Sequence, residues 1–390
     1  MRDKRDFSAK EFNLGTITQQ PTPHFDGAIP WTEVAGPLVA AEDRLARLDE
    51  RLTRSPVRDG WIERQNFHDA VAALWIEGEL VHLEDLVLHD AHMDVRVPTH
   101  ELTRAHSFLR VRRQIFVNKP DWALSRVGLR QLTGRAGETA RAGEGEEADM
   151  AAPAAPEAEP DDDGALAAEF AVFDAVLERS RAVLDGVASP LPRPAATAER
   201  DPLIYDPDWD ENSRLEAWLA VLGRTADLPP VLRAAVLWDT WESEAPLQHA
   251  PWLGVLLLGA MLRQGGKTAA HLACLTTGLR LVPREKRRHR SRTARLLAFL
   301  EAVSEAAALG LKAHDRLVLA REQMLRRLKG RRGHSKLPQL IEFALLRPLV
   351  SSTMIEKELK VTTRGALNLV AELGLREITG RGRYRAWGVL

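Results

Sequence analysis

The sequence contains a single cysteine, Cys274, so no disulfide can form within the chain. This low cysteine usage fits the reducing cytoplasm. The N-terminal residues lack the apolar core of a secretory signal peptide. The longest apolar run, Trp252–Leu262, is too short to cross a bilayer and favours a buried helix. We therefore expect a soluble cytoplasmic protein with no membrane partner.

The chain also lacks an overall excess of charge, because 54 Lys and Arg face 55 Asp and Glu. A net charge of -1 does not by itself predict a nucleic-acid-binding protein, so the distribution of charge must decide. From Arg321 onward, fifteen basic residues stand against six acidic ones. An acidic stretch elsewhere offsets this basic C-terminal segment. The asymmetry predicts an anionic partner for the C-terminal segment.

Alternation of apolar and polar residues with a period of two is scarce, which argues against a large sheet. The 390 residues are enough for two or three domains. We predict a mainly α protein with helical N-terminal and central domains and a C-terminal winged helix-turn-helix. The segments are an irregular arm (1–30), an N-terminal helical domain (31–133), an acidic disordered linker rich in Gly, Ala, Pro, Glu and Asp (134–164), a central helical domain (165–330) and the winged helix-turn-helix (331–390).

Several basic residues outside the C-terminal segment allow two interpretations. One helix is predicted to begin after Pro98. Its outward face and the residues that follow it carry the basic residues Arg104, Arg110, Arg112, Arg113 and Lys119. These residues would form either a second phosphate-contacting surface or a solvated helix face. The basic run 284–292 likewise lies between two predicted helices. It would either touch the DNA backbone or form a solvated loop.

The C-terminal segment contains two short helices and a hairpin in succession. Ile355 and Leu359 lie four residues apart on the first predicted helix, Ser352–Leu359. Thr362 or Thr363 can cap a second helix, and Gly374 can end it in a left-handed conformation. Ala366, Leu367, Val370 and Leu373 are the predicted buried stripe of that second helix. Two short strands, Leu375–Ile378 and Tyr384–Val389, are expected beyond it.

Helix, turn, helix and hairpin is the order of a winged helix-turn-helix, whose second helix enters the major groove of double-stranded DNA. The predicted outward residues include Thr363, Arg364, Asn368 and Glu372. Arg and Asn can each form two hydrogen bonds to one base. The predicted DNA-binding residues are Thr362, Thr363, Arg364 and Asn368 on the helix, with Arg381, Arg383, Tyr384 and Arg385 on the wing. The alternative is a small helical domain that packs against its own chain or a partner.

Signatures of enzymes, metals and cofactors are weak in this sequence. Gly265–Thr268 resembles the end of a phosphate-binding loop, but Met261 stands where the motif needs its first glycine. Histidines near residue 90 do not show the tight, repeated spacing that a zinc site requires. We therefore expect no cofactor and no metal.

Two stretches carry a resemblance to a known family, Asp69–Glu79 and Thr362–Glu377. Through them the whole chain resembles uncharacterised, often plasmid-borne proteins of rhizobia and their relatives that end in a helix-turn-helix DNA-binding domain. The resemblance implies DNA binding without an established biological role.

More remotely, Ile76-Glu77-Gly78 and the C-terminal winged helix resemble parts of Fic-family proteins, whose active members transfer AMP to hydroxyl groups. The catalytic signature of that family, His-Pro-Phe, an acid and Gly-Asn-Gly-Arg, is absent, and the nearest stretch is His249–Gly254. Ala73 stands where the family's inhibitory motif has Ser or Thr. We expect a DNA-binding regulator that can form a homodimer, and not an enzyme. The alternatives are a divergent nucleotidyl transferase and a protein-interaction module.

Overall fold

The computed structural model describes residues 28–93, 97–133, 206, 209–328, 336–379 and 385–389. These residues are mainly helical, which confirms the predicted fold class. The helices are α1 (Trp31–Thr53), α2 (Arg58–Glu77), α3 (Leu83–Asp90), α4 (His100–Val117), the 3-10 helix η1 (Trp122–Leu124), α5 (Arg126–Leu132), α7 (Glu211–Arg224), α8 (Pro230–Glu244), α9 (Leu253–Gln264), α10 (Leu275–Leu281), α11 (Arg284–Arg287), α12 (Arg292–Arg327), α13 (Leu337–Leu346), α14 (Ser352–Leu359) and α15 (Thr363–Leu373). The strands are β1 (Val350–Ser351), β2 (Arg376–Glu377) and β3 (Ala386–Gly388).

Local sequence signals set several of these helix boundaries. The side chain of Thr99 accepts a hydrogen bond from the Leu102 amide and caps α4. Gly78 ends α2 at φ 92°, a left-handed conformation that favours glycine. The apolar run at 252–262 forms α9, and residues 253–262 of this helix are all buried. No helix among the described residues is both long and apolar enough to cross a membrane.

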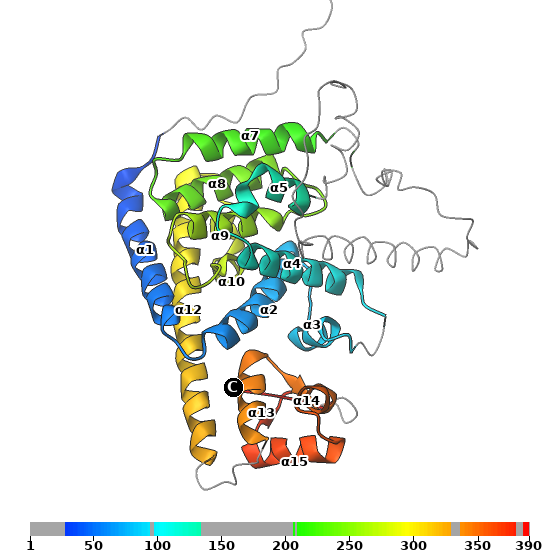
Figure 1. Ribbon diagram of the computed structural model, residues 1–390. Coiled ribbons are helices and arrows are strands. Elements are labelled where there is room, and N and C mark those ends of the chain that lie inside the picture. The colour runs from blue at the N-terminus through cyan, green and yellow to red at the C-terminus, as the bar shows by residue number, and fades with distance from the viewer. Residues whose placement is uncertain are drawn as a thin grey trace, which may run out of the picture. The chain divides into compact units, whose positions relative to one another are not determined.

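Helices from both predicted helical domains share one hydrophobic core. α1 packs along α12, while α2 packs against α10 and α4 (Figure 1). Phe67 on α2, Phe108 on α4 and Leu257 on α9 are fully buried in the same cluster. Helical spacing within each segment could not show this, because the contacts join residues far apart in the chain. We call α1–α5 together with α7–α12 the helical body.

The tryptophans of the 210–252 segment belong to this core or pack against it. Trp218 and Trp241 are buried with their ring centroids 5.3 Å apart in an edge-to-face arrangement. Their indole N–H groups donate to the carbonyls of Leu237 and Pro251. The buried polar edges are therefore satisfied, which makes these large side chains favourable core residues.

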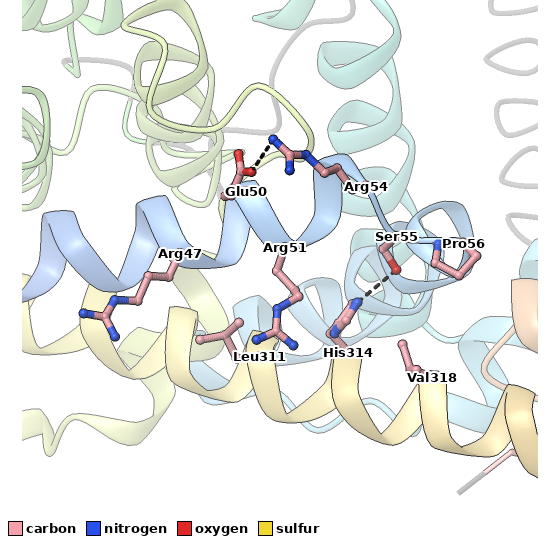
Figure 2. A pocket seen from close by; sticks show the side chains of 9 residues that line it. All are labelled: Arg47, Glu50, Arg51, Arg54, Ser55, Pro56, Leu311, His314 and Val318. Carbon is pink, nitrogen blue, oxygen red and sulfur yellow. Dashed lines mark hydrogen bonds and ion pairs between the residues drawn. The ribbon is translucent and has the colours of Figure 1, made fainter.

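A groove of about 650 Å³ lies between the C-terminal half of α1 and the middle of α12 (Figure 2). Its arginines are each paired with a carboxylate, Arg47 with Asp43, Arg51 with Asp315 and Arg54 with Glu50. His314 lies at its base, and its Nε2 atom is 2.9 Å from the hydroxyl oxygen of Ser55. This contact joins α12 to the turn between α1 and α2.

Candidate nucleic-acid interface

The C-terminal domain has the element order α13–β1–α14–α15–β2–β3, which is the winged helix-turn-helix order with one strand before α14. β3 lies between β1 and β2 in an antiparallel sheet, with Val350 opposite Trp387 and Arg376 opposite Gly388. The two strands of the predicted hairpin are present but shorter. β1 was not predicted, because two residues are too few to show a periodicity.

The first helix of the motif has the predicted bounds, Ser352–Leu359. The Ser351 side chain accepts a hydrogen bond from the Met354 amide and caps it. Ile355 and Leu359 are buried, as their spacing predicted. Lys360 then adopts a left-handed conformation at φ 52° and turns the chain toward α15.

The second helix, α15, is capped by Thr362, whose hydroxyl oxygen accepts from the Gly365 amide at 3.2 Å. Thr362 is therefore the cap and Thr363 is the first helical residue. Gly374 ends the helix at φ 66°, as predicted. These two signals fix where α15 begins and ends, and so which side chains it presents at its N-terminus.

The buried side of α15 consists of Ala366, Val370 and Leu373, each no more than 4% exposed. The prediction that Leu367 belongs to this stripe is wrong, because Leu367 is 38% exposed. Successive residues of an α-helix are about 100° apart, so Leu367 lies on a different side from its neighbour Ala366. An apolar side chain therefore stands on the surface of the helix proposed to contact DNA.

The outward side of α15 presents the predicted base-contacting residues. Thr363, Arg364 and Asn368 are exposed. No hydrogen bond or ion pair joins Arg364 or Asn368 to another residue in the described part of the chain. Their guanidinium and amide groups are thus available for a ligand. The structure brings these three residues together on one helix, with Thr362 at its cap.

The wing residues are described only in part. Arg381, Arg383 and Tyr384 lie outside the described residues. Arg385 donates to the Glu377 carboxylate at 2.6 Å, and its guanidinium lies over the Trp387 ring at 5.4 Å. The hydrogen bond from Arg385 lowers the pKa of the Glu377 carboxyl below its usual range. Arg385 is therefore held along the hairpin, and its predicted phosphate contact would have to share this guanidinium with Glu377.

The helical body holds the C-terminal domain at two helix ends. Arg64 on α2 donates to the carbonyls of Ala344 and Leu345 at the end of α13. Arg327 on α12 donates to the carbonyl of Leu373 at the end of α15. The last carbonyls of a helix have no partner within it, so both arginines satisfy groups that would otherwise be unpaired. Sequence reasoning did not identify either contact, since it joins residues distant in the chain.

Apolar packing reinforces this attachment. Leu48, Leu52, Val57 and Trp61 of the helical body share a core cluster with the C-terminal domain. The members of that cluster from the C-terminal domain include Leu340, Ile341, Ile355, Val370 and Trp387. One side of the C-terminal domain thus packs against its own chain, as the alternative interpretation predicted. The outward side of α15 remains exposed.

The basic residues of α4 hold the helical body together. Arg104 pairs with Glu77 and Glu79, and Arg113 pairs with Glu63 and Asp90. Arg112 is 1% exposed and reaches Asn66, Asp69 and the carbonyls of Leu272 and Ala273. For these three arginines both interpretations, a phosphate-contacting surface and a solvated face, are wrong. The carboxylates that pair with them lie on α2, on α3 and in the turn after α2, which the sequence of α4 cannot reveal.

The basic run at 284–292 is partly engaged by acidic residues of the helical body. Lys286 pairs with Glu301, and Arg292 pairs with Asp239. Arg284 and Arg290 are exposed. Most of this run therefore stabilises the junction of α8, α11 and α12. The contact of Arg284 and Arg290 with the DNA backbone stays a prediction.

The segments that resembled a phosphate-binding loop and a metal site have ordinary partners. Lys267 pairs with Glu42, and the histidines His89 and His106 pack edge to face with centroids 4.7 Å apart. Within the described ranges, no group of three or more His, Cys, Asp or Glu side chains is arranged to hold a metal ion. His249 begins the stretch nearest to the Fic catalytic signature, and its Nδ1 atom lies 3.3 Å from the Glu211 carboxylate.

Comparison with known proteins matches the C-terminal domain and the segment before it to two different families. Residues 337–390 match a family described as an HTH DNA binding domain. Residues 203–329 match a family described as a protein of unknown function, DUF1612. The chain is 50% identical over 373 residues to a protein of Sinorhizobium fredii named "Uncharacterized protein y4cF". That alignment covers 93% of this chain and 98% of the relative.

These matches confirm the resemblance to an uncharacterised rhizobial protein and the presence of a C-terminal helix-turn-helix DNA-binding domain. The match to a DNA-binding domain spans α13 to β3, the elements that carry Arg364 and Asn368. Plasmid association and the remote resemblance to Fic proteins stay predictions.

Proposed function

The chain belongs to the family of the Sinorhizobium fredii protein y4cF and ends in a helix-turn-helix DNA-binding domain, and from this premise we propose that it regulates transcription by binding specific sites in double-stranded DNA. Arg364 and Asn368 on α15 contact base edges in the major groove. Thr362, Thr363 and the wing arginines contact phosphates. The protein acts without a cofactor and is not an enzyme.

The observation that carries this proposal is that Arg364 and Asn368 are exposed and have no hydrogen-bond or ion-pair partner among the residues that the structure describes. A residue that stabilises the fold would pair with its neighbours, as Arg112 and Arg64 do. Arg364 and Asn368 instead project from the side of α15 opposite Ala366, Val370 and Leu373. A helix that is fixed on one side and presents Arg and Asn on the opposite side is the arrangement that major-groove recognition requires.

The charge of the C-terminal segment supports the same conclusion. Fifteen basic residues against six acidic ones give it a positive excess that attracts phosphates. Arginines that are internal to the helical body, such as Arg104 and Arg113, do not contribute to this attraction, since they are already paired. DNA should therefore approach the C-terminal domain first.

We also propose that the protein binds DNA as a homodimer, because one winged helix contacts only a few base pairs. Two copies related by a two-fold axis would place two α15 helices on half-sites about 10 base pairs apart, or a multiple of that spacing. Light scattering of the full chain tests the oligomeric state. A monomer at the concentration that saturates DNA would contradict this part of the proposal.

The experiment that tests the function is selection of DNA by the full chain from a pool of random duplexes. The full chain is needed because the C-terminal domain shares its core with α1 and α2. We expect enrichment of one short recurrent sequence. Enrichment without a recurrent sequence would leave only a generic basic surface, and no enrichment at low salt would contradict DNA binding altogether.

The regulatory role has its own test. Chromatin immunoprecipitation in the source organism should place the selected sequence beside promoters, and deletion of the gene should change the transcription of the adjacent genes. Occupied sites with no effect on transcription would retain DNA binding and contradict regulation.

A further inference from the structure

The outward surface of α15 carries two parallel lines of exposed side chains. Arg364, Asn368 and Glu372 form a polar line. Thr363, Leu367 and Ala371 form a second, largely apolar line directly beside it. Residues four apart on a helix lie nearly above one another, while adjacent residues are about 100° apart. The two lines therefore run along the helix side by side, and we call the second one the apolar line.

Leu367 is the member of the apolar line that reaches farthest from the helix. It is 38% exposed, whereas Ala366, Val370 and Leu373 are buried against the rest of the domain. Thr363 and Ala371 have short side chains that each end in a methyl group. A leucine on the surface needs no explanation by itself. Its place here is informative because it directly precedes Asn368, which is predicted to contact a base.

A helix that places Arg364 and Asn368 against base edges must also bring the apolar line against the DNA. The major groove presents hydrogen-bond donors and acceptors from every base pair, but only one apolar group, the C5 methyl of thymine. Any other partner would leave the Leu367 side chain against polar base edges. A thymine methyl is therefore the best chemical match for Leu367.

We propose that Leu367 is a specificity-determining residue that contacts the C5 methyl of a thymine within the DNA site. This inference rests on the proposed function, and it adds the chemistry of the site that the protein selects. The recognised sequence contains a thymine next to the base pairs that Arg364 and Asn368 contact. The methyl groups of Thr363 and Ala371 flank this contact and exclude water from it, while the Thr363 hydroxyl contacts a phosphate.

The test replaces each thymine of the selected duplex in turn by deoxyuridine, which removes only the C5 methyl. Full-length wild-type protein should lose about threefold to fivefold in affinity at one position, the loss expected for about 0.8 kcal/mol of apolar contact. The Leu367→Ala variant should bind the unmodified duplex more weakly by a similar factor, and it should no longer distinguish thymine from deoxyuridine at that position.

Two further variants separate recognition from folding. Leu367→Met keeps a long apolar side chain, so it should retain part of the thymine preference. Leu319 on α12 is also an exposed leucine, at 52%, and Leu319→Ala should keep the full preference. Thermal unfolding of all three variants should match that of the wild type, since neither leucine is buried.

The outcomes distinguish this inference from the function on which it rests. Loss of the thymine preference in Leu367→Ala alone supports the contact. A selected sequence at which no thymine methyl depends on Leu367 would overturn the inference and leave DNA binding intact. Failure of the wild-type protein to select any sequence would overturn the proposed function, and the inference with it.

Discussion

The guanidinium of Arg64 donates a hydrogen bond of 3.0 Å to the carbonyl of Leu345, which joins α2 of the helical body to the last turn of α13. A second bond of 2.6 Å reaches the carbonyl of Ala344. Burial lowers the pKa of Arg64 to about 10, so it remains charged at neutral pH. Helix α13 therefore begins the DNA-binding domain already attached to the helical body. The orientation of α15 depends on that attachment.

Gly60 on α2 provides the closest approach at this junction. A Cβ atom added at Gly60 would lie 2.4 Å from the Leu345 carbonyl oxygen. Gly60→Ala should therefore destabilise the protein by about 1–3 kcal/mol, because α2 and α13 would have to move apart. The expected result is a lower midpoint of thermal unfolding and weaker binding to the selected DNA.

Gly223 on α7 gives a matched control, since a Cβ atom there meets nothing within 4 Å. Gly223→Ala should stabilise the protein by up to about 1 kcal/mol, because alanine favours the helix. If Gly60→Ala and Gly223→Ala shifted the unfolding midpoint in the same direction, the close approach of α2 to α13 would be refuted.

The ion pair between Arg112 and Asp69 should dominate the stability of the helical body. The side chains are 2% and 1% exposed, with Arg112 Nη1 and Asp69 Oδ2 2.8 Å apart. Arg112→Met would leave the Asp69 carboxylate buried without its cation, at a cost of about 3–5 kcal/mol. Urea unfolding measures this loss directly.

The exposed pair between Arg47 and Asp43 is the corresponding control, with side chains 71% and 50% exposed. Arg47→Met should change the free energy of unfolding by less than about 0.5 kcal/mol, because solvent screens that pair. If Arg112→Met and Arg47→Met lowered the free energy of unfolding equally, burial would not increase the contribution of the Arg112–Asp69 pair to stability, and the prediction would be wrong.

Stability should fall as the pH drops below about 6.5, the usual pKa of histidine. His271 is 1% exposed, and burial lowers its pKa, with Arg112 and Arg58 acting in the same direction and Asp49 opposing them. The unfolded chain then binds a proton that the folded chain does not. The free energy of unfolding should decrease by at most about 1.4 kcal/mol per pH unit from this residue.

Urea unfolding at several pH values between 7.5 and 5 tests this dependence. His271→Gln should flatten this dependence of the free energy of unfolding on pH. An unchanged slope in His271→Gln would exclude His271 as the cause. The contact between His271 Nδ1 and Asp49 Oδ1, at 2.9 Å, predicts that this variant is also less stable at neutral pH.

Cys274 should be unreactive in the folded protein. It is buried beside Arg112, and burial raises the pKa of its thiol to about 12. Only the thiolate attacks electrophiles, so iodoacetamide should modify the native protein only through unfolding. Since the chain has one cysteine, the labelling rate reports unfolding directly. Rapid labelling under native conditions would contradict the described burial.

Local signals predicted the helix-turn-helix well. The cap at Thr362, the left-handed Gly374 and the spacing of Ile355 and Leu359 each act within a few residues, so the sequence alone carries them. The assignment of Leu367 was wrong because the buried side of α15 is narrow. Its direction is set by packing against α13 and α14, which a single helix does not encode.

Long-range contacts account for most of what was missed. The sequence around Arg112 predicted a surface charge. In the structure, α2 and the residues before α10 surround its guanidinium with hydrogen-bond acceptors. The sequence around Arg64 and Arg327 does not indicate their contacts, because the carbonyls that they bind belong to helix ends far along the chain. The shared core of the 31–133 and 210–328 segments follows from the same kind of contact.

The most direct test of DNA recognition by α15 compares the affinities of wild-type protein, Asn368→Ala and Arg383→Ala for the selected duplex and for a scrambled one. Asn368→Ala should lose about 1–3 kcal/mol on the selected duplex and little on the scrambled one. Arg383→Ala should weaken both alike and reduce the dependence on salt by roughly one counterion. Equal losses on both duplexes for both variants would contradict recognition of bases by α15.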